Sequence, residues 1–220
     1  MNSNITKIIL ERHGESIGNA ERRCLGHTDL DLSPLGYRQA EIAARALAEE
    51  KIDAIYSSDL VRAHNTAVPH ARIRGIEVID DENLREIFLG EWEGASVERL
   101  ETECYDQFVL GWRKSFGTFC PPGGESVQAL GERIYDEVVS LAKQNAGRTI
   151  LLTSHAAAIR AFWGKVTNVP PEELVLRVEF PTNASFTTVI FDGEKFIPLS
   201  FSDDRHFKDT ASAPVGSIFF

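Results

Sequence analysis

The sequence predicts an α/β protein, a three-layer αβα sandwich with a mostly parallel central sheet and helices on both faces. Two observations predict this fold class. Short apolar runs rich in β-branched residues recur along the chain, and segments with apolar residues at helical spacing separate them. Strands that alternate with helices form parallel sheets, because each helix returns the chain across one face of the sheet. At 220 residues, the chain can bury such a core without disulfide or metal support.

The first half of the chain shows this alternation in order. Lys7 to Leu10 is a short β-branched apolar run and predicts a buried strand. After a polar loop, Ser33 and Pro34 predict the N-cap and the first residue of a helix. Alanines and leucines recur at helical spacing over Gln39–Glu50, which continues this helix. The elements expected next are a strand at Asp53–Tyr56, a helix at Leu60–Arg72 and a strand at Glu77–Ile79.

The second half begins with an irregular stretch and then resumes the alternation. Residues 92–122 show no clear period. Gly123–Ser126 opens a long amphipathic helix that is expected to end near Lys143. The remaining expected elements are a strand at Thr149–Thr153, a helix that begins at Ser154-His155, and a hairpin of Ser185–Phe191 with Lys195–Leu199 around Asp192-Gly193.

The domain organisation follows from what the sequence lacks. No repeat, low-complexity tract or linker divides it, so we expect one domain over residues 1–220. Residues 94–122 are expected to form a cap-like insertion, and residues 201–220 a C-terminal tail. The tail ends in the apolar segment Ser217–Phe220, which is expected to dock on the domain or on a second subunit. A homodimer is therefore one expectation.

Composition and charge exclude several classes of function. The chain has 23 basic and 33 acidic residues and a net charge of −10, which argues against nucleic acid or an anionic membrane surface as a partner. A local cluster of arginines could still bind a small anion. No apolar run approaches the ~20 residues that span a bilayer, and the first residues lack a signal-peptide core. Three scattered cysteines have neither zinc nor redox spacing, so we expect a reduced, cytoplasmic protein.

Charged and polar side chains follow three of the expected strands. Arg12 and His13 come after the first strand with Asn19 close behind, Arg62 follows the second strand, and His155 follows a later one. Because ligands bind beyond the carboxyl ends of parallel strands, these side chains are expected to meet at one edge of the sheet. Guanidinium groups match phosphate oxygens, and imidazole can attack phosphorus or stabilise a transition state. The sequence therefore predicts a phosphate site.

Several motifs around these residues occur in a fixed order. They are Leu10–Ser16 with Asn19, Tyr56–Ala63, Leu84–Glu86, Gly90–Gly94, Pro122–Ser126 and Thr153–His155, and they cover about residues 7–165. With this ordered set, the chain resembles the histidine phosphatase superfamily, also called the phosphoglycerate mutase-like family. A lone Arg-His-Gly would be weak evidence, whereas the ordered set is specific.

The resemblance implies roles for the site residues. His13 corresponds to the nucleophile that becomes phosphohistidine, and Arg12, Arg62 and His155 correspond to the clamp on the phosphoryl oxygens. Asn19 matches a position that helps to bind the same group. Because the arginines supply the positive charge, the resemblance implies neither a metal nor another cofactor.

The resemblance also implies an acid–base residue. Glu86 corresponds to the proton donor to the leaving oxygen and, later, to the base that activates water. The surrounding segment is acidic throughout, so Glu82, Glu91 and Glu93 remain alternative donors.

The chain departs from the family pattern at several positions. Ala156–Ala158 stands where glycines commonly follow the second histidine, so the backbone is expected to approach the phosphate less freely there. Glu11 replaces an apolar residue, and its carboxyl group is expected near the mouth of the site. The tryptophans are expected to pack in the core, with Trp92 or Trp112 as the candidates to line a substrate pocket.

Three functions compete at this point. The leading hypothesis is a metal-independent phosphomonoesterase that hydrolyses small phosphorylated metabolites through a phosphohistidine. A cofactor-dependent phosphoglycerate mutase is the first alternative. Gly90–Gly94 resembles the phosphatase branch, and residues 94–122 are fewer than the mutases usually insert there, which favours hydrolysis. A non-catalytic phospho-ligand-binding protein is the other alternative, and the full set of catalytic residue types argues against it.

Overall fold

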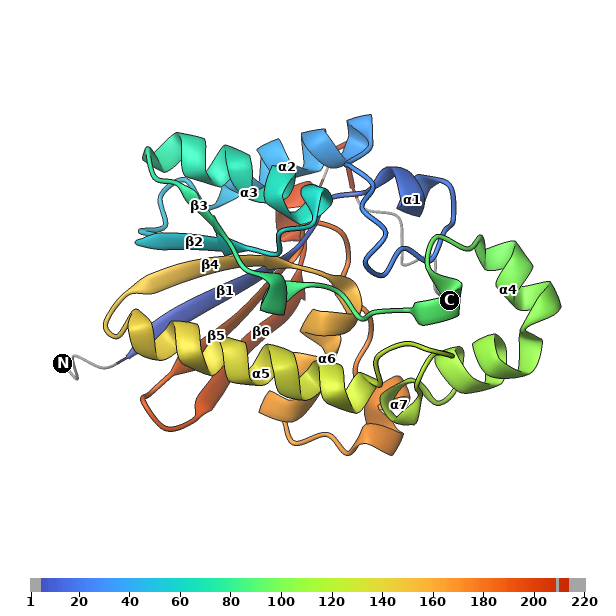
Figure 1. Cartoon of the computed structure of the whole chain (residues 1–220). Coiled ribbons are helices and arrows are strands. Elements are labelled where there is room, and N and C mark those ends of the chain that lie inside the picture. The colour runs from blue at the N-terminus through green and yellow to red at the C-terminus, as the bar shows by residue number, and fades with distance from the viewer. Residues whose placement is uncertain (1–4, 209, 214–220) are drawn as a thin grey trace.

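A six-stranded sheet forms the centre of the structure, a computed structural model that describes residues 5–208 and 210–213 (Figure 1). The strand order is β3-β2-β4-β1-β5-β6. The strands are β1 (Thr6–Arg12), β2 (Ala54–Ser57), β3 (Val78–Asp80), β4 (Thr149–Ser154), β5 (Phe186–Phe191) and β6 (Phe196–Asp203). The first four strands run parallel to one another, whereas the hairpin β5–β6 adds two antiparallel strands beside β1.

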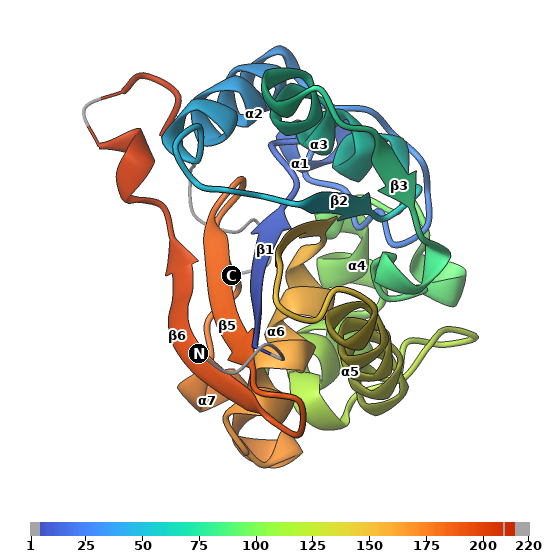
Figure 2. The same cartoon turned by 90° about the vertical axis from the view of Figure 1, so that its left-hand side faces the viewer.

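Helices cover both faces of the sheet. The α-helices are α1 (Ile17–Ala20), α2 (Pro34–Ala46), α3 (Val61–Arg74), α4 (Val97–Glu103), α5 (Val127–Gln144), α6 (Ala156–Val166) and α7 (Leu174–Arg177). Figures 1 and 2 show α2 and α3 on one face and α5 and α6 on the other. The predicted three-layer sandwich is therefore confirmed. Within the described part of the chain, no helix is long and apolar enough to cross a membrane.

Alternate side chains of β1 belong to two different halves of the core. Ile8 and Leu10 pack in the cluster that contains the buried faces of α5 and α6. Ile9 packs in the cluster that contains small buried residues of α2 and α3. A strand that is covered on both faces reads as a continuous apolar run, as it does here. The carboxyl end of this central strand delivers Arg12 and His13 to one edge of the sheet.

The helices α2 and α5 begin at serine caps, of which the sequence predicts the one at Ser33. Ser33 Oγ accepts the backbone N–H of Gly36 at 3.1 Å, and Pro34 is the first residue of α2. Ser126 Oγ accepts the N–H of Ala129 at 3.1 Å at the start of α5. Each cap satisfies an N–H group that has no acceptor inside its helix.

The helix α2 ends earlier than its sequence period predicts. The alanine and leucine spacing continues to Glu50, but the helix ends at Ala46. The carbonyl oxygens of Leu47 and Glu50 instead accept hydrogen bonds from the guanidinium of Arg74 at the end of α3. A tertiary contact therefore replaces the last helical turn.

The last strand is longer than predicted. β6 continues past Leu199 to Asp203, because Asp203 still pairs with Phe186 of β5 after a register shift. The first part of the expected tail is therefore sheet. The expected docking of Ser217–Phe220 lies outside the described residues.

Residues 94–122 form a compact helical segment although their sequence shows no period. They contain α4, a π-helix over Asp106–Arg113 and a short 3-10 turn. Phe108, Trp112 and Phe116 are buried in the same core cluster as α5 and α6. Helices this short depend on packing rather than on their own propensity. Figure 1 shows α4 at the end of the molecule where α1 lies.

Candidate active site

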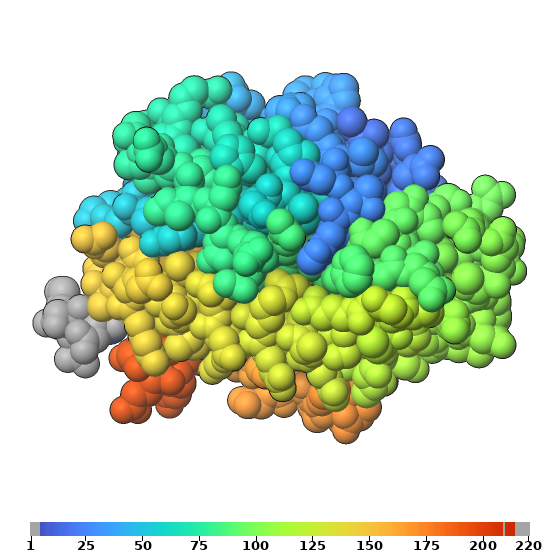
Figure 3. All heavy atoms as spheres, in the orientation of Figure 1, coloured from blue at the N-terminus to red at the C-terminus, as the bar shows by residue number. Residues whose placement is uncertain are grey.

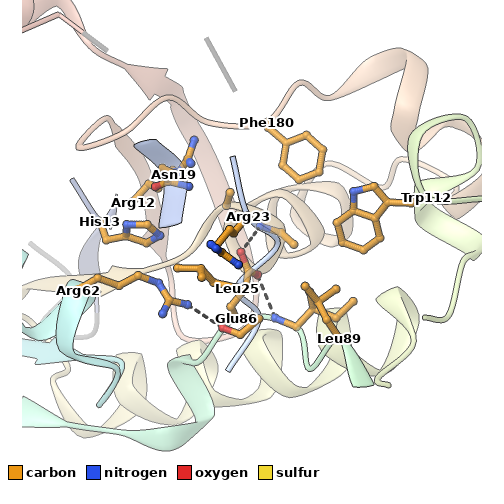
Figure 4. A pocket seen from close by; sticks show the side chains of 14 residues that line it. Arg12, His13, Asn19, Arg23, Leu25, Arg62, Glu86, Leu89, Trp112 and Phe180 are labelled. Atoms are coloured by element: carbon orange, nitrogen blue, oxygen red, sulfur yellow. Dashed lines mark hydrogen bonds between the residues drawn. The ribbon is translucent and has the colours of Figure 1, made fainter. Parts of the chain in front are cut away.

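A pocket lies at the carboxyl ends of the central strands, where the sequence predicts a phosphate site. The space between its lining residues, with open solvent included, is about 420 Å³. In Figure 3, the segment after β1 (blue) and the segment 94–122 (green) meet on this face of the molecule. The predicted site residues that line the pocket are Arg12, His13, Asn19, Arg62 and Glu86 (Figure 4). His155 is fully buried, contacts the His13 ring and does not line the pocket.

The imidazole of His13 is held in one orientation. Its Nδ1 lies 2.6 Å from the carbonyl oxygen of Gly14, which can only accept, so Nδ1 carries the proton and Nε2 keeps its lone pair. Burial and the positive charges of Arg62 and Arg12 hold the pKa of His13 well below its usual range. The ring is therefore neutral at physiological pH, and Nε2 can act as a nucleophile.

His155 immediately precedes the first turn of α6 and is packed against His13. The two ring centroids lie 5.1 Å apart in an edge-to-face arrangement. Nε2 of His155 lies 2.8 Å from Ser58 Oγ, which follows β2. Burial, followed by the charge of Arg62, keeps the pKa of His155 well below its usual range. Like His13, this histidine is therefore neutral at physiological pH.

Two buried arginines supply the positive charge. Arg12 donates from Nη1 to the carbonyl oxygen of Pro181 at 2.6 Å, and Arg62 donates to the carbonyl oxygens of Thr28 at 3.0 Å and Gly26 at 2.7 Å. Burial lowers the pKa of each guanidinium to about 10, so both stay charged at neutral pH. The Nε of each finds no acceptor within the described residues. Buried cations with spare donors bind anions, because an anion restores both lost hydration and missing hydrogen bonds.

Glu86 lies across the pocket from the arginines, at the N-terminus of α6. Its carboxylate accepts the backbone N–H groups of Ile87 at 3.0 Å and of Ala157 and Ala158 at 3.1 Å each. The alanines that replace the usual glycines thus use their N–H groups to hold a carboxylate. The negative charge of Glu86 also opposes the lowering of the pKa of Arg12.

Asn19 combines a structural contact with a place on the pocket wall. Its Oδ1 accepts the N–H of Ser16 at 3.1 Å, and Ser16 Oγ accepts the N–H of Asn19 at 3.0 Å, a reciprocal cap of α1. Asn183 also reaches Asn19 Oδ1, at 3.4 Å. The cap fixes the side chain beside Arg12, which leaves its amide nitrogen as the group available to a phosphoryl oxygen.

Several residues of the site carry no signal in the sequence. Asn183 donates to the carbonyl oxygen of His13 at 3.0 Å from a position 170 residues away, and Thr66 Oγ1 accepts the N–H of Gly14 at 3.0 Å. Pro181 contributes a backbone carbonyl, which no side-chain pattern can announce. Asn183 and Pro181 reach the site because β5 pairs antiparallel with β1, so the segment before β5 meets the residues after β1. Thr66 reaches it from α3.

One sequence expectation at the site is wrong. The carboxyl group of Glu11 does not lie at the mouth of the pocket but is fully buried, with Oε2 at 2.8 Å from Nε2 of His70 in α3. The reason is strand alternation, since Glu11 shares the face of Ile9 and points toward α3. Burial raises the pKa of Glu11, while the nearby His70 opposes the rise.

Of the two tryptophan candidates, Trp112 lines the pocket. Trp92 instead packs in the core.

The described residues offer no metal site. Over residues 5–208 and 210–213, histidine, cysteine and acidic side chains form no group of three or more that could hold an ion. Arg12 and Arg62 occupy the place where a phosphatase of another kind would need a cation.

Two curated relatives match most of this chain. The chain is 31% identical over 216 residues to phosphoglycerate mutase-like protein 4 of Arabidopsis thaliana, across 96% of this chain and 90% of the relative. It is 34% identical over 209 residues to the metal-independent phosphoserine phosphatase of the same plant, across 93% and 84% of the two chains.

Solved structures also match most of this chain. Bacillus stearothermophilus YhfR superposes with a TM-score of 0.83 and 29% identity, over 91% of this chain and 98% of the other. The phosphoserine phosphatase of Entamoeba histolytica, solved with 3-phosphoglyceric acid, superposes with a TM-score of 0.77 and 31% identity over 91% and 98%. The profile of the histidine phosphatase superfamily (branch 1) matches residues 8–204. The chain therefore belongs to branch 1 of the histidine phosphatase superfamily.

Proposed function

We propose that this phosphatase hydrolyses small phosphomonoesters by way of a phosphohistidine on Nε2 of His13. The observation that carries the proposal is the state of His13. It is a neutral imidazole whose Nδ1 proton is bound by Gly14, next to two charged guanidinium groups. A nucleophile with a lone pair faces a site that attracts a phosphate dianion.

The first step transfers the phosphoryl group to the protein. Nε2 of His13 donates its electron pair to phosphorus, the ester P–O bond breaks, and the leaving oxygen takes a proton from Glu86. Arg12 and Arg62 neutralise the charge on the phosphoryl oxygens. The positive charge that forms on the imidazole ring is shared through Nδ1–H with the carbonyl oxygen of Gly14.

The second step returns the protein to its starting state. Glu86, now a carboxylate, takes a proton from water, the water oxygen attacks phosphorus, and the P–N bond breaks. Inorganic phosphate leaves, and His13 is neutral again. The three N–H groups that bind Glu86 stabilise its carboxylate in this step.

Relatives indicate the size and chemistry of the substrate. The matched proteins include a phosphoserine phosphatase and a mycobacterial glucosyl-3-phosphoglycerate phosphatase, whose substrates are small phosphorylated metabolites. We propose that this chain works on the same general class without a metal or cofactor, and that residues 94–122 act as a cap over the site. Its cysteines are free, which suits a reducing compartment such as the cytoplasm.

One assay separates hydrolysis from mutase activity. The purified protein is given p-nitrophenyl phosphate and, separately, 3-phosphoglycerate with and without 2,3-bisphosphoglycerate. Hydrolysis releases inorganic phosphate from an ester without the bisphosphate. A mutase converts 3-phosphoglycerate to 2-phosphoglycerate with little release of phosphate, and that result would replace the proposal. Size-exclusion chromatography with light scattering tests the expected homodimer.

A further inference from the structure

The two ends of the active-site pocket differ in chemistry. At one end lie His13, Arg62 and the other groups that bind phosphate. Much of the rest of the pocket is lined by what we call the apolar wall, which consists of Leu25, Leu89, Trp112 and Phe180. Figure 4 shows Leu89, Trp112 and Phe180 on the side of the pocket away from His13 and Arg62. The side of the substrate that leaves as an alcohol must lie against this wall when phosphorus lies at His13.

The apolar wall is assembled before any ligand binds. The ring of Phe116 lies edge-to-face with Trp112 at 4.9 Å and with Phe180 at 5.1 Å between centroids. The guanidinium of Arg160 lies 4.2 Å from the centre of the Phe180 ring, and it donates to the carbonyl oxygen of Val178 at 2.8 Å. These contacts fix both aromatic rings, so a substrate meets a formed surface and does not have to order it.

The wall offers little to a charged alcohol half. Among the described lining residues, Arg23 is the one ionised side chain outside the phosphate end. Its Nε donates to Glu21 at 2.8 Å, and its Nη1 donates to the carbonyl oxygen of Gly94 at 3.0 Å. Glu21 therefore balances part of the Arg23 charge, in an ion pair that solvent reaches. A carboxylate or ammonium group placed against Leu25 and Leu89 would lose water and gain no equivalent partner.

We propose, on the basis of the function proposed above, that the substrates of this enzyme are phosphomonoesters of apolar or aromatic alcohols. Leu25, Leu89, Trp112 and Phe180 select them. Each methylene group that leaves water for the wall should raise kcat/KM by about fourfold, until the wall is filled. The alcohols of these substrates are apolar, whereas the alcohol parts of phosphoserine and 3-phosphoglycerate are small and charged.

The test compares esters that leave as primary alkoxides, so that the demand for a proton stays similar. We expect kcat/KM for 2-phenylethyl phosphate to exceed that for phosphoserine and for 3-phosphoglycerate by at least about tenfold. Across ethyl, butyl and hexyl phosphate, kcat/KM should rise. A flat alkyl series, or a preference for the charged esters, would overturn the proposal. If no ester is hydrolysed, p-nitrophenyl phosphate included, the function proposed above fails as well.

Variants of the wall test the assignment to these residues. Leu89→Gln keeps the size of the side chain and adds a polar amide, so the ratio of kcat/KM for 2-phenylethyl over ethyl phosphate should fall about tenfold. Leu176→Gln in α7 is the matched control, because Leu176 is 86% exposed, and its ratio should equal that of the unaltered protein. If Leu89→Gln does not fold, as judged by circular dichroism, Leu25→Gln serves the same measurement. An unchanged ratio in a folded wall variant would overturn the assignment.

Discussion

Nη2 of Arg62 lies 2.7 Å from the carbonyl oxygen of Gly26, in a turn that Glu93 holds in place. Gly26 has a φ of 53°, and a Cβ there would come within 2.0 Å of Glu93 Oε1, so only glycine fits. The carboxylate of Glu93 accepts the N–H groups of His27 at 2.9 Å and Thr28 at 2.7 Å. The position of the phosphate-binding guanidinium therefore depends on a carboxylate that does not line the pocket itself.

This arrangement predicts the effect of Glu93→Gln. The amide nitrogen cannot accept, so donors of the 26–28 turn lose a partner, at a cost of ~1–3 kcal/mol. We expect kcat/KM for p-nitrophenyl phosphate to fall on the order of tenfold, with weaker inhibition by inorganic phosphate. Glu98→Gln is the control, because Glu98 is exposed in α4. Unchanged phosphate inhibition in Glu93→Gln would show that the turn does not position Arg62.

Replacement of the nucleophile His13 is expected to have the largest effect on turnover. Because His13 alone is placed to form the bond to phosphorus, His13→Ala should lower kcat on the order of 10³-fold or more. Rapid acid-free quenching of the unaltered protein with ³²P-labelled substrate should trap phosphate that is labile in acid and stable in base. Near-normal turnover by His13→Ala would exclude the phosphohistidine route.

The elements that could be predicted from the sequence are those fixed by local chemistry. The apolar run of β1, the serine cap of α2 and the start of α5 depend on residues a few positions apart, and they lie where expected. The sequence also predicted that Arg12, His13 and Arg62 lie close together, because parallel strands end at one edge of the sheet.

The rest depends on contacts between distant segments. Asn183 and His13 meet only because the terminal hairpin reverses beside β1. Glu11 is buried beside His70 of α3, and no motif links the two residues. The fold of residues 94–122 depends on the burial of Phe116 against Phe180, which lies far along the chain, and a short window of sequence holds no information about that packing.

Removal of divalent metal tests where the positive charge comes from. The charges of Arg12 and Arg62 are buried in the site, and the described residues provide no cluster for an ion. Prolonged dialysis against EDTA should therefore leave the rate of p-nitrophenyl phosphate hydrolysis unchanged. A loss of activity that Mg²⁺ or Zn²⁺ restores would contradict the mechanism proposed here.

The buried histidines predict how stability changes with pH. Burial keeps the pKa of both His13 and His155 well below the ordinary value of 6.5. Below pH 6.5 the unfolded chain therefore binds protons that the folded protein does not, and the free energy of unfolding decreases as the pH falls. Urea unfolding should show a loss on the order of 1 kcal/mol per histidine between pH 7.5 and 5.5. His155→Asn should reduce this loss, whereas His64→Asn, outside the site, should not.

Glu86 sits where a proton donor to the leaving oxygen is needed, but its contacts also suit a purely structural carboxylate. Ile87 and Ala158 donate to Oε1, whereas Oε2 accepts the single N–H of Ala157. Oε2 therefore has a free position for a proton. The alternative donor Glu93 is excluded by its four hydrogen bonds to the turn at 26–28 and to Leu89.

The leaving-group dependence of Glu86→Gln separates these roles. An alkoxide needs a proton as its bond to phosphorus breaks, whereas p-nitrophenolate, a weak base, needs one much less. Glu86→Gln should therefore slow phosphorylation of His13 by 2-phenylethyl phosphate by roughly 10²–10⁴-fold, and by p-nitrophenyl phosphate far less. The rates must be measured in single turnovers, because loss of the base in the second step would slow hydrolysis equally for every ester.

The amide oxygen of the Glu86→Gln variant can still accept from Ile87 and Ala158, so the loop should keep its place, which an unchanged melting temperature would verify. Equal defects for both esters would make Glu86 a positioning residue and leave the acid to be found elsewhere in the pocket.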